Sequence, residues 1–310
     1  MEHWELKQMQ SLPLEAKIIK TQQRIKEWYE HWDGNVYVSF SGGIDSTVLL
    51  HIVREMYPEV PAVFADTGLE YPKIREFVST VDNVRWMQPK TPFTTVIKEQ
   101  GFPVGSKKVS RAIRDLQNPT DANKNVRNLY LTGLNKKGET VKSFKLAKRW
   151  IKLIDGPYKF SEKCCDITKK EPFKRYEKET KRKPIAGTMA DESGLRASQY
   201  LKTGCNSFNG KRQISNPLGF WTRQDVLQYI LQYSVSYCEV YGYIIVDDNG
   251  NLDTSLEKRT GCMFCMFGVQ LEKGENRFQR MKRTDPKIYD YCINQLGIGE
   301  VLDFIGVKYA

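Results

Sequence analysis

A glycine turn between a buried strand and an apolar helix constrains the fold of this chain most. Residues 36–40 read Val-Tyr-Val-Ser-Phe, a β-rich run typical of a buried strand, and residues 46–53 form a strongly apolar run that predicts a helix. The turn between them contains Gly42 and Gly43. Backbone N–H groups at such a turn, together with the positive end of the following helix, suit an anion. The sequence therefore predicts a phosphate-binding turn.

The side chains around this turn also suit a phosphate. Gly42 and Gly43 allow a ligand to approach the backbone closely, and Asp45 can cap the helix or position a magnesium-bound nucleotide. Hydroxyl groups that can reach phosphate oxygens come from Ser39, Ser41 and Ser46. The pattern is neither the Walker motif nor the dinucleotide fingerprint. A Ser-Gly-Gly sequence alone also fits an ordinary turn, but the flanking strand and helix favour the phosphate site.

Strands and helices alternate through the first third of the chain. Residues 60–65 predict a second strand that ends on Asp66, Thr67 and Gly68, residues 71–78 predict a helix, and residues 81–87 predict a third strand. This alternation predicts an α/β fold with a parallel twisted sheet and helices on both faces. Elsewhere, residues 11–32 predict an amphipathic helix, Thr222 is a good N-cap, and residues 247–250 predict a hairpin turn.

The length of 310 residues suits one main domain with an appendage. We expect an N-terminal helical segment at residues 1–34, a nucleotide-binding α/β domain at residues 35–235 and a cysteine-containing appendage at residues 236–310. A basic insertion lies near residues 105–156, where strong periodicity is lacking. This insertion is equally compatible with a lid, a surface that faces nucleic acid, or a solvated loop region.

The charge of the chain favours polyanionic partners. Lys and Arg number 48 against 37 Asp and Glu, a formal net charge of +11. Such an excess attracts nucleotides or nucleic acids, although a solvated basic surface explains it equally well. No run of apolar residues is long enough to cross a bilayer. We therefore expect a cytoplasmic protein with no membrane partner.

The turn and the second strand together resemble a known superfamily. The sequence from Ser41 to Ser46 resembles the PP-loop of the adenine-nucleotide α-hydrolase (PP-loop ATP pyrophosphatase) superfamily. Asp66-Thr67-Gly68 resembles the second motif of its branch that contains the phosphoadenosine-phosphosulfate (PAPS) reductases. The resemblance implies an enzyme that binds ATP or a PAPS-type adenine nucleotide with Mg²⁺, with Asp66 and Gly68 lining the pocket.

Further matches lie at Gly187 and at Arg196. The resemblance implies that Gly187 lies near the nucleotide and that Arg196 contacts the phosphate or sulfate of the substrate. A surface salt bridge is the alternative for Arg196. Ile44 stands where many PP-loops have lysine, so Lys or Arg from elsewhere must neutralise the phosphates.

Two close pairs of cysteines suggest a metal centre. The pairs are Cys164-Cys165 and Cys262-x-x-Cys265, and four thiolates favour zinc or an iron–sulfur cluster. Adjacent cysteines are awkward ligands for zinc. Their arrangement resembles the [4Fe–4S] site of the sulfonucleotide reductases that carry a cluster. Zinc, and buried free cysteines, are the alternatives.

The remaining cysteines bear on the reaction. Cys205 is a candidate reactive thiol, whereas Cys238 and Cys292 lie in aromatic-rich stretches typical of a core. Sulfonucleotide reductases carry a nucleophilic cysteine in a C-terminal segment, and residues 301–310 contain none. We therefore expect adenylation of an acceptor, such as a nucleic acid, followed by sulfur transfer.

Other hypotheses stay open at this point. One is thiol-dependent PAPS reduction, which needs a thiol-reductant protein, whereas sulfur transfer needs a sulfur-donor protein. For either reaction the candidate catalytic residues are Asp45, Arg196 and Cys205. Another is a nucleotide-sensing or nucleic-acid-binding regulator without turnover, which Ile44 favours. A hydrolase of the same fold stabilised by zinc is the third.

Overall fold

The computed structural model describes residues 1–210 and 212–310, which form two compact units. The first unit contains Met1–Asp66, Glu70–Gln88 and Pro172–Thr260. The second contains Thr67–Leu69, Pro89–Glu171 and Gly261–Ala310. The expected division at residues 34/35 and 235/236 stays a prediction. No helix in these described ranges has both the length and the apolar character to span a bilayer.

The first unit is built around a six-stranded sheet in the order β3-β2-β1-β4-β6-β5. All neighbouring strands pair in parallel except β5, which is antiparallel to β6 at the edge. The strands are β1 (Val36–Phe40), β2 (Ala62–Ala65), β3 (Val84–Met87), β4 (Lys183–Ala186), β5 (Asn206–Ser207) and β6 (Ile214–Ser215). The helices are α1 (His3–Gln10), α2 (Leu14–His31), α3 (Ile44–Met56), α4 (Pro72–Ser79), α9 (Glu171–Thr180), α10 (Gly194–Thr203) and α11 (Arg223–Tyr233).

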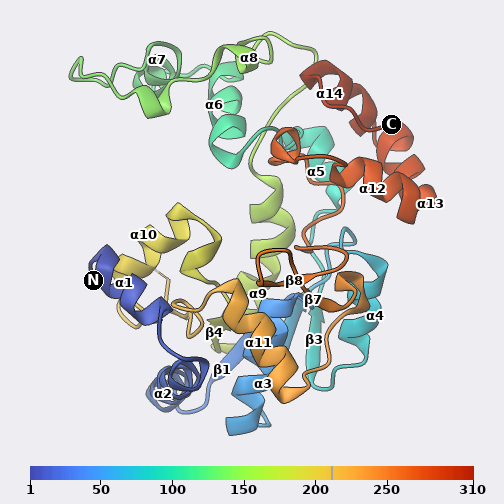
Figure 1. The fold of residues 1–310 in the computed structure, drawn as a ribbon. Coiled ribbons are helices and arrows are strands. Elements are labelled where there is room, and N and C mark those ends of the chain that lie inside the picture. Colours follow the sequence, from blue (N-terminus) through green and yellow to red (C-terminus); the bar gives the residue numbers. More distant parts are fainter. Residues whose placement is uncertain (211) are drawn as a thin grey trace. The chain divides into compact units, whose positions relative to one another are not determined.

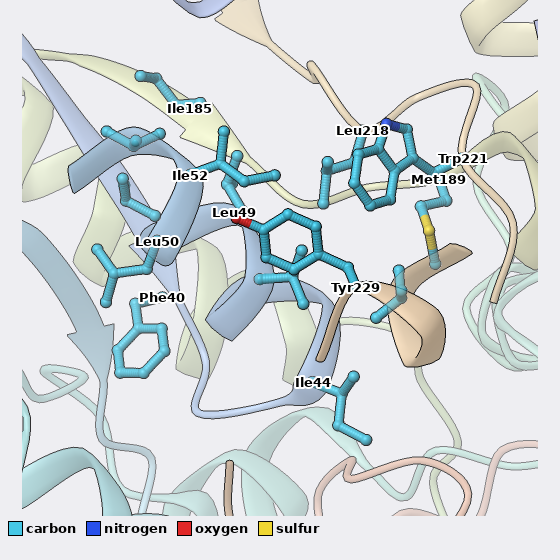
Figure 2. Close-up of a cluster of buried hydrophobic side chains, with 14 of the residues drawn as sticks. Phe40, Ile44, Leu49, Leu50, Ile52, Ile185, Met189, Leu218, Trp221 and Tyr229 are labelled. Carbon is cyan, nitrogen blue, oxygen red and sulfur yellow. The ribbon is translucent and has the colours of Figure 1, made fainter. Parts of the chain in front are cut away.

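Alternating side chains of β1 and β2 pack on opposite faces of the sheet, as a two-residue period requires. Val36, Val38 and Phe40 join the large core that α2, α3 and α11 cover, part of which Figure 2 shows. Tyr37 and Val63 pack on the other face against Tyr176 of α9. The sheet is therefore covered on both faces, and the predicted α/β fold is confirmed.

Other local predictions for this unit are also confirmed. Thr222 caps α11 by accepting a hydrogen bond from the Asp225 N–H. Residues 247–250 connect β7 (Ile244–Val246) and β8 (Leu252–Thr254), which pair antiparallel. Two short 3₁₀ helices, η3 (Ala190–Glu192) and η4 (Glu239–Tyr241), also belong to this unit.

The second unit is largely helical (Figure 1). Its helices are α5 (Phe93–Gln100), α6 (Lys107–Gln117), α7 (Lys124–Thr132), α8 (Lys148–Ile151), α12 (Arg277–Thr284), α13 (Pro286–Asp290) and α14 (Ile298–Ile305). Shorter or irregular helical turns are η1 (Lys142–Phe144), η2 (Asp166–Lys170), η5 (Val269–Leu271) and η6 (Tyr291–Gln295). The basic segment near residues 105–156 thus contains helices, so a purely loop-like structure is wrong for it. Its apolar residues Val109, Ala112, Ile113 and Leu116 have the helical spacing that defines α6.

Candidate functional site

The glycine turn lies where the order of the sheet strands reverses. β1 is flanked by β2 on one side and by β4 on the other, so the crossover connections leave β1 in opposite directions. Ligands of parallel α/β sheets bind at the carboxyl ends of the strands at such a switch point. The turn leads directly from β1 into α3, whose 13 residues direct their positive end toward it. The predicted strand, turn and helix are therefore in the arrangement that binds an anion.

Two glycines near this turn allow close packing that no other residue permits. Gly42 has a φ of 69°, and a Cβ atom there would lie 2.8 Å from Val78 Cγ2 and 2.9 Å from Ile74 Cγ2. Gly187 directly follows β4, and a Cβ atom there would lie 3.1 Å from the Asp45 carbonyl oxygen. Gly187 thus brings the end of β4 against the first turn of α3. Its predicted contact with a nucleotide stays a prediction.

Hydroxyl groups gather at the turn. Ser41 and Ser46 lie with their Oγ atoms 3.0 Å apart, and the Ser41 N–H donates to Ser46 Oγ at 3.1 Å. The Ile44 N–H donates to the Tyr241 hydroxyl oxygen at 3.3 Å, and that hydroxyl lies 2.6 Å from Thr260 Oγ1. The predicted hydroxyls of Ser41 and Ser46 are therefore at the turn, and Tyr241 and Thr260 join them from distant sequence.

Asp45 is the carboxylate of this site. Burial raises its pKa, while the positive charges of Arg223, Arg259 and Arg196 act in the opposite direction. These three arginines are contributed by the start of α11, the segment after β8 and the start of α10. The first turn of α3 therefore faces an excess of positive charge, which is the setting that a nucleotide polyphosphate requires.

The three arginines differ in their partners. Arg196 forms an ion pair with Glu192, and Arg223 donates to Thr254 Oγ1 at 3.0 Å and lies 3.6 Å from Asp253. Arg259 is exposed, and within residues 1–210 and 212–310 it has no hydrogen bond or ion pair. Ile44 is buried, with no charge of its own. The arginines can thus supply the charge that the missing lysine would have given.

Sequence reasoning identified Arg196 but missed Arg223 and Arg259. Arg223 follows the predicted N-cap Thr222, and Arg259 stands three residues before Cys262. Neither position carries a local pattern that points to Asp45, which is more than 170 residues away in sequence. The requirement for a substitute cation at Ile44 was the available signal, and it did not specify which residue provides one.

Ser39, Asp66 and Gly68 were also predicted to contact a nucleotide. Ser39 lies on β1, paired with Val63 of β2 and Ala186 of β4. Asp66 directly follows β2, is buried and forms an ion pair with Arg75 of α4 at 3.0 Å. Gly68 belongs to the second unit and has a φ of 73°. Their predicted contacts with a nucleotide stay predictions.

All four paired cysteines lie in the second unit. Cys164 and Cys165 start a helical turn that continues into the π-helical η2, and the Cys265 N–H donates to the Cys262 carbonyl oxygen at 3.1 Å. A hydrogen bond from the Cys164 thiol, together with the charges of Lys107 and Lys169, lowers the pKa of Cys165 to about 6. The same hydrogen bond, with burial and the other three sulfurs, raises the pKa of Cys164. The two pairs are therefore close enough to influence one another.

The four paired cysteines are candidate ligands of a metal ion or an iron–sulfur cluster. Among the described residues, no group of three or more His, Cys, Asp or Glu side chains is placed to hold one metal ion. A single zinc draws all its sulfur ligands to about 2.3 Å of one point. In an iron–sulfur cluster each thiolate ligates a different iron, so the ligands stand further apart. Four mutually interacting thiols in one unit are chemically suitable for such a cluster.

The remaining cysteines are buried. Cys205 contacts the Tyr200 hydroxyl at 3.6 Å, and burial raises the pKa of its thiol. Burial likewise raises the pKa values of Cys238 and Cys292. A core position was predicted for Cys238 and Cys292, and their burial agrees with it. The surroundings of Cys205 disfavour a thiolate.

Curated proteins with one shared name are similar in sequence to this chain. The phosphoadenosine 5'-phosphosulfate reductase of Vibrio campbellii (strain ATCC BAA-1116) is 25% identical over 240 residues, which cover 76% of this chain and 73% of that protein. The protein of the same name from Salmonella choleraesuis (strain SC-B67) is 24% identical over 238 residues, covering 76% and 77%.

Two solved structures are more distant. The phosphate complex of phosphoadenylyl-sulfate (PAPS) reductase from Candida auris has a TM-score of 0.41 and 16% identity, and the match covers 77% of this chain and 90% of that chain. The U34-tRNA thiolase from Methanococcus maripaludis, solved with its [4Fe–4S] cluster, has a TM-score of 0.37 and 14% identity, and covers 95% and 82%.

A family profile covers most of the sequence. The phosphoadenosine phosphosulfate reductase domain matches residues 35–103 and 110–265. The matched residues include the glycine turn, Arg196 and the four paired cysteines. This chain therefore belongs to the phosphoadenosine phosphosulfate reductase domain family.

Proposed function

We propose that this chain binds ATP on the turn at residues 39–46 and adenylates an acceptor, which then receives sulfur. The observation that carries the proposal is the charge around Asp45. Arg196, Arg223 and Arg259 act on this half-buried carboxylate at the positive end of α3. Such a setting favours a bound polyphosphate and the negative charge that develops on a leaving pyrophosphate.

The reaction needs no change of oxidation state. An oxygen of the acceptor attacks the α-phosphorus, a new P–O bond forms, and the bond to the β-phosphate oxygen breaks as pyrophosphate leaves. A hydrosulfide from a sulfur-donor protein then attacks the acceptor carbon that bears the adenylated oxygen. The C–S bond forms, the C–O bond breaks, and AMP leaves with the electron pair. Adenylation is useful because AMP is a much better leaving group than hydroxide.

The state of the unpaired thiols supports this reaction over PAPS reduction. Thiol-dependent reduction requires a thiolate that attacks the sulfate sulfur. Cys205, Cys238 and Cys292 are buried, and burial raises the pKa of each. Within the described residues, the cysteines outside the two pairs are thus poor nucleophiles. PAPS reduction is retained as the second candidate because the curated relatives carry that name.

Two inorganic groups belong to the proposal. Mg²⁺ is commonly held by one or two carboxylates together with substrate phosphates, so Asp45 is the residue to hold it with the nucleotide. Cys164, Cys165, Cys262 and Cys265 would hold a [4Fe–4S] cluster, with one thiolate on each iron. The residues of this chain bind and orient the nucleotide and stabilise charge, whatever the sulfur source.

Product analysis tests the proposed reaction. Anaerobically purified protein is incubated separately with ATP and with PAPS, and AMP, pyrophosphate and sulfite are measured. Without an acceptor, water can attack the α-phosphorus, so we expect AMP and pyrophosphate from ATP. Asp45→Ala should lower kcat/KM for this hydrolysis roughly 100-fold or more. Asp248→Ala, a change at an exposed carboxylate of the β7–β8 turn, is the matched control. Sulfite from PAPS without AMP from ATP would instead establish a reductase.

The arginines provide a finer test. Arg259→Ala should weaken ATP binding by roughly 10- to 150-fold, since hydrogen bonds to charged groups contribute about 1.5–3 kcal/mol. Its neighbour Lys258 pairs with Asp253 and is not among the charges that act on Asp45, so Lys258→Ala is a control with the same change of charge. Equal effects of the two changes would contradict the proposed role of Arg259. Tight ATP binding without turnover would favour a nucleotide-sensing regulator.

A further inference from the structure

Nearly all of the net positive charge of the chain lies in one segment, which we call the basic arm, residues 107–152. The basic arm contains 13 Lys and Arg against three Asp and Glu, whereas the rest of the chain has 35 against 34. Ten of the 11 net positive charges are therefore in this segment. A solvated surface of an ordinary globular protein mixes both signs instead.

The basic arm is a folded element with its own apolar side. Its helices α6, α7 and α8 lie together (Figure 1). Ile113 and Leu116 of α6 are buried, as are Tyr130 of α7 and Trp150 of α8. The Leu146 N–H donates to the Tyr130 carbonyl oxygen at 2.8 Å, which ties the later part of the arm to α7. The charges are therefore displayed on a defined scaffold.

Most of these charges face solvent without a counter-ion. Eleven of the 13 basic side chains are exposed. Among the residues that the structure describes, none of the nine lysines of the basic arm forms an ion pair. Eleven unpaired or weakly paired like charges on one scaffold repel one another, and a bound polyanion relieves that repulsion.

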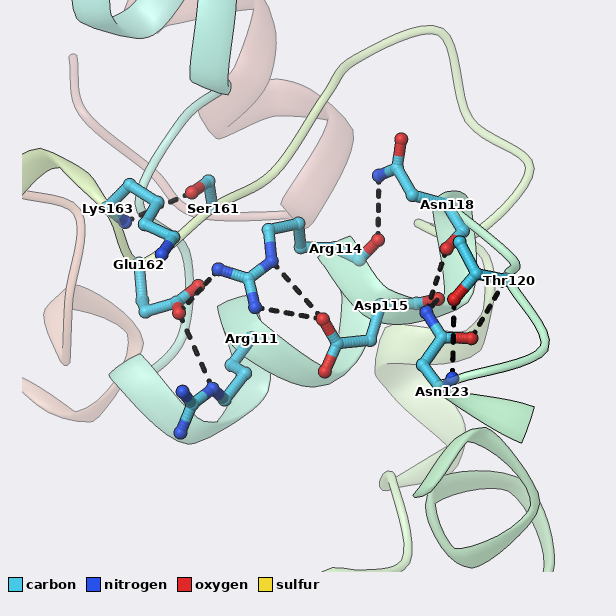
Figure 3. Close-up of polar contacts among 9 residues, drawn as sticks. All are labelled: Arg111, Arg114, Asp115, Asn118, Thr120, Asn123, Ser161, Glu162 and Lys163. Atoms are coloured by element: carbon cyan, nitrogen blue, oxygen red, sulfur yellow. Dashed lines mark hydrogen bonds and ion pairs between the residues drawn. The ribbon is translucent and has the colours of Figure 1, made fainter. Parts of the chain in front are cut away.

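The base of the basic arm is fixed beside the first cysteine pair. Glu162 accepts a hydrogen bond from Arg114 at 2.6 Å and lies 3.5 Å from Arg111, as Figure 3 shows. Glu162 is buried and stands two residues before Cys164. A ligand on the basic arm is thereby held near the cysteines of the same unit.

We propose that the basic arm binds the phosphate backbone of a nucleic acid. Exposed Phe144 lies within the arm, with Lys108 Nζ 4.1 Å from its ring centroid, and a ring of this kind can stack on a base. A membrane surface fits less well, because the apolar face of α6 is buried rather than available for lipid. This binding needs neither ATP nor turnover, so it stands or falls separately from the proposed reaction.

The test measures binding of the full chain to fluorescein-labelled RNA and DNA oligonucleotides, single-stranded and duplex, without ATP. Fluorescence anisotropy is recorded from 50 to 300 mM KCl, a range chosen for its sensitivity to phosphate contacts (about 0.9 units of log–log slope per contact). The variant Lys136→Gln/Lys142→Gln/Lys148→Gln removes three exposed charges of the basic arm. The control Lys7→Gln/Lys20→Gln/Lys178→Gln removes three exposed charges elsewhere.

We expect the arm variant to bind roughly 10- to 100-fold more weakly near 0.1 M salt, with a salt slope smaller by about two to three. The control variant should bind like the wild type, and equal circular dichroism spectra verify that both variants are folded. Equal losses in the two variants would overturn the proposal. So would a lack of oligonucleotide binding, or binding only to vesicles with anionic lipid.

Discussion

Gly42 shows how strictly the glycine turn limits the choice of residue. Its φ of 69° and the nearness of Val78 and Ile74 both exclude a larger side chain. We expect Gly42→Ala to lower the free energy of unfolding by about 2–4 kcal/mol, which combines the strain of a positive φ with overpacking. Urea denaturation measures this loss, and isothermal titration should show that ATP binding is lost with it.

Gly250 provides the matched control. It has a φ of 80° in the β7–β8 turn, but a Cβ atom there would meet nothing within 4 Å. Gly250→Ala should therefore cost only about 1–2 kcal/mol from backbone strain. If Gly42→Ala costs no more than Gly250→Ala, the contacts with Val78 and Ile74 do not restrict the turn.

The arginines near Asp45 show which single residues of the candidate site the sequence could not predict. Ser41, Gly42, Asp45 and Ser46 could be predicted because the turn is one continuous piece of sequence. Arg223 and Arg259 could not, because their role depends on how α11 and the segment after β8 fold back onto α3. Propensity and spacing do not encode such long-range contacts.

Tyr241 of η4 contacts the start of α3, and this contact between two elements can be tested by its dependence on pH. Burial raises the pKa of Tyr241 to about 12, above the ordinary value of 10.0. Since the folded pKa is the higher one, the stabilisation is fully present below pH 10 and is lost as the pH rises through 12. The advantage of the wild type over Tyr241→Phe should shrink by about 1.4 kcal/mol for each pH unit in this window.

Unfolding by urea at pH 9, 10, 11 and 12 measures that difference. Tyr243 is 81% exposed, so Tyr243→Phe is the matched control and should follow the wild type at every pH. A constant difference between wild type and Tyr241→Phe would show that the Tyr241 hydroxyl is not held in the buried contact with Ile44 and Thr260.

Elements differ in how well the sequence predicts them. β1, α3 and α11 were predictable because a β-rich run, an apolar run and the N-cap Thr222 are local signals. The basic arm was not assigned helices because lysines dominate its composition and its helices are short. In α6, however, Val109, Ala112, Ile113 and Leu116 have helical spacing, and the last three are buried.

At the scale of the whole molecule, the candidate site residues are divided between the two units. The glycine turn, Asp45 and the three arginines belong to the first unit, while the paired cysteines and the basic arm belong to the second. Each unit is assembled from separate stretches of the chain, so neither can be excised as one continuous piece. The sequence therefore predicted the glycine turn and the cysteine pairs, but not how the stretches of chain are divided between the two units.

A cluster bound by the cysteine pairs should stabilise one unit selectively. A ligand that binds only the folded state stabilises the structure that holds it. We expect anaerobic reconstitution with iron and sulfide to give about four irons per chain. Cys165→Ser and Cys262→Ser should lose most of this iron, whereas Cys292→Ser, a change at a buried cysteine of the same unit outside the pairs, should keep it.

Hydrogen exchange then locates the stabilisation. Removing the iron with a chelator should reduce protection in peptides from residues 89–171 and 261–310, because the ligand no longer opposes local opening there. Peptides from residues 1–66, which contain β1 and α3, should keep their protection, and ATP affinity should change little. A folded protein that carries only zinc would contradict the cluster. Protection lost equally across both units would contradict a stabilisation confined to the second one, and would mean that the two units open together.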